Sequence, residues 1–426
     1  MTDSPWPKNW EIKKLSQIAE LIRNSVSPDS VVAQYIGLEH IEKYTLRILN
    51  TGNSIDTISK KYLFKNNDIL FGRLRPYFRK IIRPRFDGVC STDIFVFRAK
   101  NGIYQKFLFY FLAASEFVQV ASRSDYGTKM PRADWNFLKN TTWAVPPFNE
   151  QETIAEILSS MDAKIDFLRR QNITLEALAE TVYKDFFVAD KKNWPKIPAG
   201  QLFNLTIGRT PPRQEKQHFS FNSSDKIWVS IKDMAGKNLY ISDSSEYLTG
   251  EAVKQFNIPV IGPDTVILSF KMTVGRVAVT TRNMYSNEAI AAFNRSDRSS
   301  VPYQYLYFFL KLFRYDELGT TSTITTSINT KLIKDIGVPV PDRKLLDEFT
   351  GICDILFNKI KYNIEQIGLL ENMRDLAIDK LVTGRFRVSA EKQTPAEKSL
   401  FDEQIAVPTS EADSIADVFN LLNIPA

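Results

Sequence analysis

The chain has 426 residues, of which 43% are hydrophobic and 24% charged, which excludes a disordered protein and suffices for two or three folded domains. Its longest apolar runs are far shorter than the ~18 residues of a membrane-spanning helix, and its first residues do not resemble a secretory signal. With two distant cysteines and two histidines, the composition speaks against structural zinc and predicts a cytoplasmic protein with two buried thiols.

The net charge of +6 is unevenly distributed along the chain. Residues 390–426 contain two lysines and seven acidic residues, so this tail carries −5 and the rest of the chain carries +11. A body this basic suggests a polyanionic partner, although an excess of lysine can also form an ordinary solvated surface. We expect the acidic, proline-containing tail to be flexible.

The first half begins with a strand-rich stretch, in which β-branched and aromatic residues alternate with turns of Gly, Pro, Asn and Asp. Within it, residues 73–85 place six basic side chains among aromatic residues and prolines. The arginine fork binds phosphate or the O6/N7 edge of guanine with two hydrogen bonds, so we interpret this segment as a DNA contact. The alternative is a solvated edge strand whose charges prevent aggregation. The candidate residues are Arg73, Arg75, Arg79 and Lys80.

An aromatic helix is expected over residues 104–111, and a polar loop over residues 122–132 follows it. The loop offers donors, acceptors and cations of the kind that contact phosphates and base edges. Lys129 and Arg132 are therefore further candidates for DNA contacts. The alternative is a helix-capping turn followed by an edge strand.

Residues 150–188 predict a long helix with apolar residues at spacings of four and three. This period, kept over more than four heptads, indicates a coiled coil. The alternative is an amphipathic helix packed on its own domain. The predicted seam consists of Ile154, Leu158, Met161, Ile165, Leu168, Asn172, Leu175, Ala179, Val182 and Phe186.

The second half repeats the order of elements with different loops. A basic turn lies at residues 269–276, a proline-stiffened loop at 209–213, and a loop rich in hydroxyl groups at 319–329. Hydroxyl and amide groups contact phosphates or base edges, and threonine methyl groups contact thymine. The candidates in this half are Arg209, Arg213, Lys232, Lys271, Arg276, Thr323, Thr325 and Asn329.

A second long helix is predicted over residues 343–384, with the same spacing of apolar positions. Its seam consists of Phe349, Cys353, Leu356, Ile360, Asn363, Ile367, Leu370, Arg374, Ala377 and Leu381. If the halves are related by a pseudo-twofold axis, the two helices run antiparallel. With the seams aligned at their centres, Asn172 then lies opposite Asn363 and the pair fixes the register. The alternative is that both amides lie at the edge of the seam in water.

Four segments recur in the same order about 195 residues apart, which indicates a tandem duplication. They begin at Tyr35 and Trp228, Asn67 and Pro263, Cys90 and Tyr285, and Tyr104 and Tyr303.

The motifs of common catalytic sites are missing from the sequence. It contains no G-x-S-x-G elbow and no P-loop, and Val145 stands where a methyltransferase of the N/D-P-P-Y/F type needs a polar side chain. Asp342 is not followed by the D/E-x-K of a metal-dependent nuclease. We therefore expect no active site in this chain.

The order of motifs resembles the specificity subunit of type I restriction–modification systems. The resemblance covers residues 5–388 and is carried by Asp68-Ile-Leu-Phe71, Gly127-Thr-Lys-Met-Pro131, Val145-Pro-Pro-Phe-Asn-Glu-Gln151 and Leu381-Val-Thr-Gly-Arg385. The second half keeps Pro341 but lacks the Glu-Gln pair at the start of its helix.

The resemblance implies an α+β protein with two target recognition domains, at residues 1–148 and 191–341. It also implies two spacer helices, at 149–190 and 342–388, that pair as an antiparallel coiled coil with pseudo-twofold symmetry; residues 389–426 form the tail. Each domain would contact half of a bipartite, asymmetric site in double-stranded DNA.

The helices would dock two methyltransferase subunits, and motor-nuclease subunits would join the complex. S-adenosylmethionine, ATP and Mg²⁺ would bind to those partners and no cofactor to this chain. Two rival interpretations are a repeat scaffold for protein partners and a fused methyltransferase with an unrecognised motif.

Overall fold

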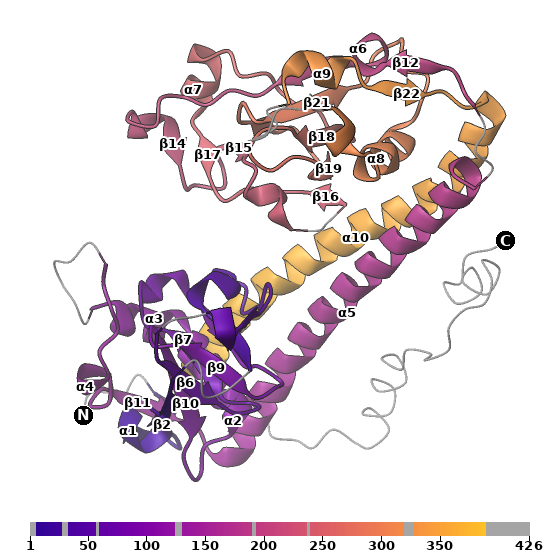
Figure 1. Cartoon of the computed structure of the whole chain (residues 1–426). Coiled ribbons are helices and arrows are strands. Elements are labelled where there is room, and N and C mark those ends of the chain that lie inside the picture. Colours follow the sequence, from indigo (N-terminus) through magenta and orange to yellow (C-terminus); the bar gives the residue numbers. More distant parts are fainter. Residues whose placement is uncertain are drawn as a thin grey trace. The chain divides into compact units, whose positions relative to one another are not determined.

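The computed structural model describes residues 6–27, 33–56, 59–123, 130–189, 193–236, 239–318 and 328–388. They form two compact units (Figure 1). Unit 1 joins the residues up to Ser160 with those from Arg374 onward, and unit 2 consists of Met161–Met373. The predicted tail, residues 389–426, lies outside the described residues.

Unit 1 is built on two sheets. The central strand β7 is buried along its whole length, which explains its unbroken apolar sequence Ile-Leu-Phe-Gly. The first sheet has the order β2-β10-β7-β8, with β2 (Ala19–Ile22), β10 (Ile94–Ala99), β7 (Ile69–Gly72) and β8 (Ile81–Ile82). The second has the order β3-β6-β9-β4-β5, with β3 (Ser25–Val26), β6 (Lys61–Phe64), β9 (Gly88–Ser91), β4 (Gln34–Ile36) and β5 (Gly52–Asn53).

Unit 2 has two sheets with closely related topology. The first has the order β13-β21-β18-β19-β16, with β13 (Asn204–Ile207), β21 (Ile290–Asn294), β18 (Val266–Ser269), β19 (Val277–Thr280) and β16 (Tyr240–Ile241). The second has the order β14-β17-β15-β20, with β14 (Phe219–Ser220), β17 (Tyr247–Leu248), β15 (Lys226–Val229) and β20 (Tyr285–Ser286).

The strand pairings show the duplication directly. In unit 1, β10 lies between β2 and β7, and in unit 2, β21 lies between β13 and β18, all antiparallel. The parallel pair β4–β9 in unit 1 has its equivalent in β15–β20 in unit 2. Each unit also has a two-stranded sheet beside its long helix. These strands are β1 (Glu11–Lys14) with β11 (Thr142–Val145), and β12 (Lys196–Pro198) with β22 (Gly337–Pro339).

The two aromatic helices are core elements, as the sequence predicts. They are α2 (Gln105–Ala113) and α8 (Tyr303–Lys311). In α2 every residue from Phe107 to Ala113 is buried, which explains why it carries no polar face. The shorter helices are α1 (Leu15–Ile18), α3 (Ser115–Ser122), α4 (Trp135–Leu138), α6 (Ala199–Leu202), α7 (Gly250–Gln255) and α9 (Thr330–Lys334).

The long helices α5 (Phe148–Phe187) and α10 (Arg343–Leu381) close the two halves of the sequence. Within unit 2 they run antiparallel, because contacts pair late residues of one with early residues of the other. Phe186 packs against Phe349 with ring centroids 6.1 Å apart, and Arg169 Nη2 lies 2.5 Å from Glu371 Oε1. The helix pair that the spacing predicts is therefore present in unit 2.

The start of α5 is held by the Glu-Gln pair that the sequence motif contains. The amide of Gln151 accepts a hydrogen bond from Tyr104 N at 2.8 Å and donates one to Pro146 O at 2.9 Å. The buried carboxylate of Glu150 pairs with Arg387 at 2.9 Å and accepts a hydrogen bond from the Trp10 indole. In the second half Leu345 and Leu346 stand in place of this pair after Pro341, and Leu346 is buried.

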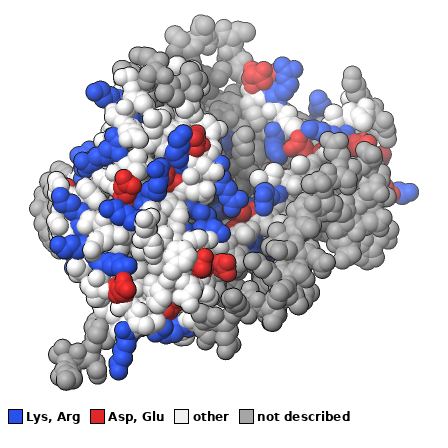
Figure 2. Space-filling view, turned by 90° about the horizontal axis from the view of Figure 1, so that it is seen from below, with Lys and Arg blue, Asp and Glu red and all other residues white. Residues whose placement is uncertain are grey.

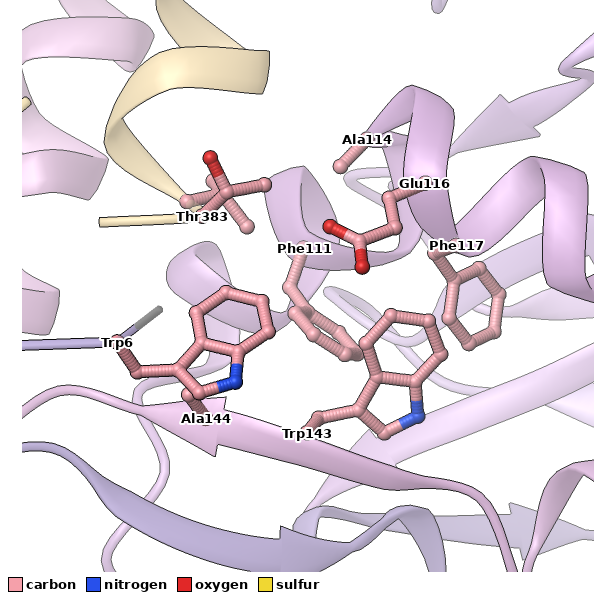
Figure 3. Close-up of a pocket in the computed structure, with 9 residues that line it drawn as sticks. Trp6, Phe111, Ala114, Glu116, Phe117, Trp143, Ala144 and Thr383 are labelled. Carbon is pink, nitrogen blue, oxygen red and sulfur yellow. The ribbon is translucent and has the colours of Figure 1, made fainter. Parts of the chain in front are cut away.

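The end of α10 completes the hydrophobic core of unit 1. Ile378, Leu381 and Val382 belong to the same buried cluster as Phe107 and Trp143. Figure 3 shows the narrow pocket at this junction, where Phe111, Phe117, Trp143 and Trp6 form aromatic walls beside Thr383. Glu116 and Thr383 add a carboxylate and a hydroxyl to this otherwise apolar lining, which brings together no acid, base and nucleophile.

The seam of α5 departs from the predicted positions near the end of the helix, whereas the unusual charged position of the α10 seam is buried as predicted. Near the end of α5 the buried face moves to Tyr183 and Phe187, whereas Phe186 is only partly buried, because Tyr305 of α8 packs there. In α10 the predicted seam position Arg374 is a charged residue that is 2% exposed. Its guanidinium lies 3.0 Å from Asp375, so the buried charge is paired.

The amides of Asn172 and Asn363 meet at the level that the alignment of the seams predicts. Asn363 is fully buried, and its Nδ2 donates to Asn172 Oδ1 and to Gln171 Oε1, both at 2.8 Å. Its Oδ1 is buried and has no hydrogen-bond partner within the described residues. A buried amide that is only partly satisfied lowers stability while it favours one alignment of the helices.

Substitutions at Asn363 should separate these two effects. Asn363→Ala removes two hydrogen bonds and leaves a cavity, so we expect the free energy of unfolding to fall by ~1–3 kcal/mol in urea titrations. Asn363→Leu fills the seam with apolar atoms and should leave stability equal to or above that of the unchanged protein. If Asn363→Leu lowers the free energy of unfolding as much as Asn363→Ala does, the amide is a net source of stability and does not serve to fix the register of the helices.

Candidate DNA interface

The structure brings together two segments of unit 1 that the sequence analysis selected separately. After β7, residues 73–75 pair with residues 131–133 as an additional short ladder. Arg75 N donates to Pro131 O and Ala133 N donates to Arg73 O, both at 2.8 Å. The basic segment and the end of the polar loop therefore form one surface.

The side chains of Arg73 and Arg75 are the strongest candidates on this surface. The Arg73 guanidinium lies over the Phe95 ring, 5.0 Å from its centroid, which restricts its motion. Neither guanidinium has an ion pair or hydrogen bond within the described residues, and both Nε atoms are buried without a partner. Two partly buried cations that lack an anion are suited to a phosphate or a guanine edge.

The other cations of this half already have partners in the protein. Arg79 forms a two-point ion pair with Asp375 of α10, with Nη1 2.7 Å from Oδ2, and its side chain is only 12% exposed. Lys80 donates to Leu38 O, and exposed Arg132 lies 3.3 Å from Asp93. The ion pair gives Arg79 a structural role that the sequence analysis did not foresee. Only β8 of this segment is an edge strand, and the candidate arginines precede it.

In unit 2 the equivalent turn follows β18. Arg276 donates from Nη1 to Ile231 O at 2.7 Å, which ties this turn to the one that carries Lys232. Lys232 and Lys271 are both exposed. Within the part of the chain that the structure describes, neither Lys232 nor Lys271 has an ion-pair partner, and the Lys271 ammonium lies 5.5 Å from the centroid of the Phe270 ring.

Arg209 and Arg213 lie on a loop anchored to buried Trp228. The Trp228 indole donates to Arg209 O at 3.1 Å, and the Arg213 guanidinium lies 4.8 Å from the Trp228 ring. Arg213 also pairs with Glu246 at 2.8 Å, and Arg209 donates to Phe256 O at 3.0 Å. Gly208 is required before this loop, because a Cβ there would lie 2.1 Å from Ser286 O.

The remaining candidates are of two kinds. Lys129, Thr323 and Thr325 lie outside the described residues. Asn329 is the N-cap of α9, where its side chain accepts a hydrogen bond from Leu332 N at 3.0 Å. This is the helix-capping role that the alternative interpretation of the loop describes.

The surface chemistry points to recognition of a polyanion. On the face shown in Figure 2, basic side chains are spread widely and acidic ones are fewer. Among the described residues no group of His, Cys, Asp and Glu could hold a metal ion, and no helix is long and apolar enough to cross a membrane.

Cys90 and Cys353 are buried free thiols, and burial raises the pKa of both well above the usual range.

One family model matches both halves of the chain. The model of the family described as "Type I restriction modification DNA specificity domain" matches residues 7–177 and again residues 191–369. The chain belongs to this family. The two matches coincide with the two copies of the repeated topology, so the chain carries two DNA specificity domains in tandem.

Curated relatives are similar over most of the chain. The MjaIX specificity subunit of Methanocaldococcus jannaschii is 23% identical over 420 residues, which cover 90% of this chain and 94% of the relative. The HindI specificity subunit of Haemophilus influenzae is 21% identical and covers 76% of this chain and 87% of the relative.

Two solved structures are also similar. The HsdS subunit of Thermoanaerobacter tengcongensis is 20% identical. The match covers 91% of this chain and 100% of that subunit, with a TM-score of 0.38. The type I S subunit of M. genitalium is 16% identical. The match covers 88% of this chain and 96% of that subunit, with a TM-score of 0.47.

The roles of Arg73 and Arg75 in this specificity-domain protein can be tested individually. Replacing either residue by Ala should weaken DNA binding by ~1–3 kcal/mol if it contacts a base, and specificity should relax at one position of the site. A phosphate contact would instead weaken binding to all sequences and reduce its salt dependence. Both are measured by titration of duplex DNA at several salt concentrations.

Lys100→Ala is a matched control for this pair. Lys100 is exposed and follows β10, whereas Arg73 lies beside the opposite end of the same strand. We expect this variant to bind DNA like the unchanged protein. Unchanged affinity and specificity in both arginine variants would show that the β7 turn does not contact DNA.

Proposed function

We propose that the chain is the non-catalytic specificity subunit of a type I restriction–modification complex and reads a bipartite, asymmetric DNA site. The observation that carries the proposal is the pair of turns after β7 and β18. They occupy the same place in the two copies of the fold but present different side chains. Unit 1 presents Arg73 and Arg75, whereas unit 2 presents Lys271 and holds Arg276 by a bond to Ile231 O.

The long helices are suited to the docking of two methyltransferase subunits. In unit 2, Ile355, Tyr362 and Leu369 of α10 follow one another at intervals of seven and are 42–54% exposed. Met373, which is 47% exposed, lies four residues after Leu369. These residues form an apolar stripe apart from the buried seam of Cys353, Leu356 and Ile360, and such a stripe suits a helix of a partner.

Catalysis belongs to the partners in this proposal. The methyltransferase subunits bind S-adenosylmethionine and flip the target adenine, and motor-nuclease subunits use ATP and Mg²⁺. The relatives named as specificity subunits, and the absence of catalytic motifs from the sequence, support this division. The complex acts on DNA in the cytoplasm.

A domain exchange tests whether the halves read DNA independently. Residues 15–141 lie between the paired strands β1 and β11, so another recognition domain can replace them without cutting that ladder. In a host with the matching methyltransferase, methylome sequencing should show one half of the methylated site changed and the other half and the gap retained. The equivalent exchange of residues 199–336, between β12 and β22, is the control and should change the other half. A change of both half-sites after one exchange would refute independent reading.

The isolated full-length chain should show no turnover of its own. We expect neither methyl transfer to DNA, nor DNA cleavage, nor ATP hydrolysis above the buffer rate, because the required motifs are missing. The assays use radiolabelled methyl donor, supercoiled plasmid and phosphate release. Activity that co-purifies with the chain and disappears with its removal would contradict the non-catalytic role.

A further inference from the structure

In unit 2 the apolar side chain of Met272 is exposed, and this exposure does not stabilise the fold. Met272 is 96% exposed, and its φ of +59° lies in the left-handed region, which is costly for a residue with a side chain. An exposed methionine at a strained position contributes neither burial nor backbone stability. Strained positions that persist in folded proteins cluster at functional sites.

The turn around Met272 is locked by hydrogen bonds. Thr273 N donates to Lys271 O at 2.7 Å, which makes Met272 the central residue of a γ-turn. Buried Ser269 closes the turn, because its Oγ donates to Thr273 O at 2.6 Å and accepts from Arg276 N at 3.0 Å. The methionine is therefore held at the tip of a rigid turn.

The base of the turn is equally constrained. Gly275 has a φ of +87°, and a Cβ there would lie 3.1 Å from the ring of Tyr315. Phe270, which is fully buried, anchors the side of the turn that precedes the tip. Lys271 is exposed beside Met272, and the bond from Arg276 to Ile231 O brings the turn that carries Lys232 close to this one.

The equivalent turn of unit 1 also has a left-handed residue at its tip. That residue is Arg75, with a φ of +52°, and it stands three positions after Gly72 as Met272 stands three positions after Ser269. The closing bonds correspond as well, because Gly72 N donates to Lys80 O at 2.8 Å and Ser269 N donates to Arg276 O at 2.9 Å. The two turns thus place a left-handed residue at the same distance from the strand, a cation in unit 1 and an apolar residue in unit 2, although the unit 1 turn is one residue longer and contains the 3-10 helix Pro76–Phe78.

We propose that Met272 is a wedge that inserts between two stacked bases of the DNA half-site read by unit 2, while Lys271 and Lys232 contact the adjoining phosphates. This inference rests on the proposed function. Apolar side chains, methionine among them, insert between base steps, unstack them in part and kink the duplex. Methionine suits this role because its unbranched, polarizable thioether packs against aromatic surfaces.

The test uses the full chain with its methyltransferase subunits, on duplexes whose site methylome sequencing has defined. A 2-aminopurine base is placed in turn at each position except the methylated adenine, because base flipping there gives its own signal. We expect one step to brighten on binding, with or without the methyl donor. Met272→Ala should abolish that signal and weaken binding about tenfold. Met272→Leu should keep most of both.

Met272→Gly separates the wedge from folding. Glycine accepts the left-handed conformation without strain, so this variant should unfold at the same or higher urea concentration and still lose the signal. Phe221→Ala is the control, because Phe221 is 86% exposed in the same unit but follows β14 on a different hairpin, and it should retain the signal at this step.

The possible outcomes separate a failure of the Met272 wedge from a failure of the proposed function. If the unchanged complex binds no DNA sequence preferentially, the proposed function fails. If it binds its site but no position brightens, or if Met272→Ala leaves the signal intact, only the wedge is refuted. A loss of methyltransferase from the Met272→Ala complex in size-exclusion chromatography, with no change at any base step, would also refute it, because Met272 would then contact protein.

Discussion

The structure depends on the packing of the last turns of α10 into the hydrophobic core of unit 1. Ile378, Leu381 and Val382 complete a core whose other members come from the first 158 residues of the chain. Polar contacts reinforce this junction: the carboxylate of Asp379 accepts hydrogen bonds from Ser115, and Arg387 pairs with buried Glu150. Unit 1 is therefore built from two stretches of sequence that lie far apart in the chain.

The same scaffold supports two different recognition surfaces because the variable residues lie outside the core. In both units the last residue of the central strand, Gly72 of β7 or Ser269 of β18, is buried. The third residue after it, Arg75 or Met272, has a left-handed backbone. The sheet fixes where the turn projects, and the side chains of the turn are free to differ. A duplicated gene can diverge at these turns without loss of the fold, since the core pairings β7–β10 and β18–β21 do not involve them.

Patterns of spacing in the sequence predicted the duplication, the aromatic helices and the meeting of Asn172 with Asn363, because recurring segments and heptads can be counted along the chain. Side-chain partners were not predictable in this way. Asp375, the partner of Arg79, lies 296 positions away in sequence, and no local pattern marks that pair. No pattern in the sequence marks Met272 either. Its turn is held by the bond from Ser269 to Thr273 and lies beside the ring of Tyr315, and the residue type of Met272 suggests neither contact.

The completion of the unit 1 core by α10 has a consequence for biosynthesis. The ribosome makes Val382 roughly 220 residues after Ser160, and at 5–20 residues per second the interval lasts about 10–45 s. During this time the aromatic wall formed by Phe111, Phe117 and Trp143 lacks its final covering segment. Exposed apolar surface of this kind binds chaperones and promotes aggregation. Maturation of the first recognition domain is therefore timed by translation of the last helix, and a chain that ends early leaves that domain unfinished.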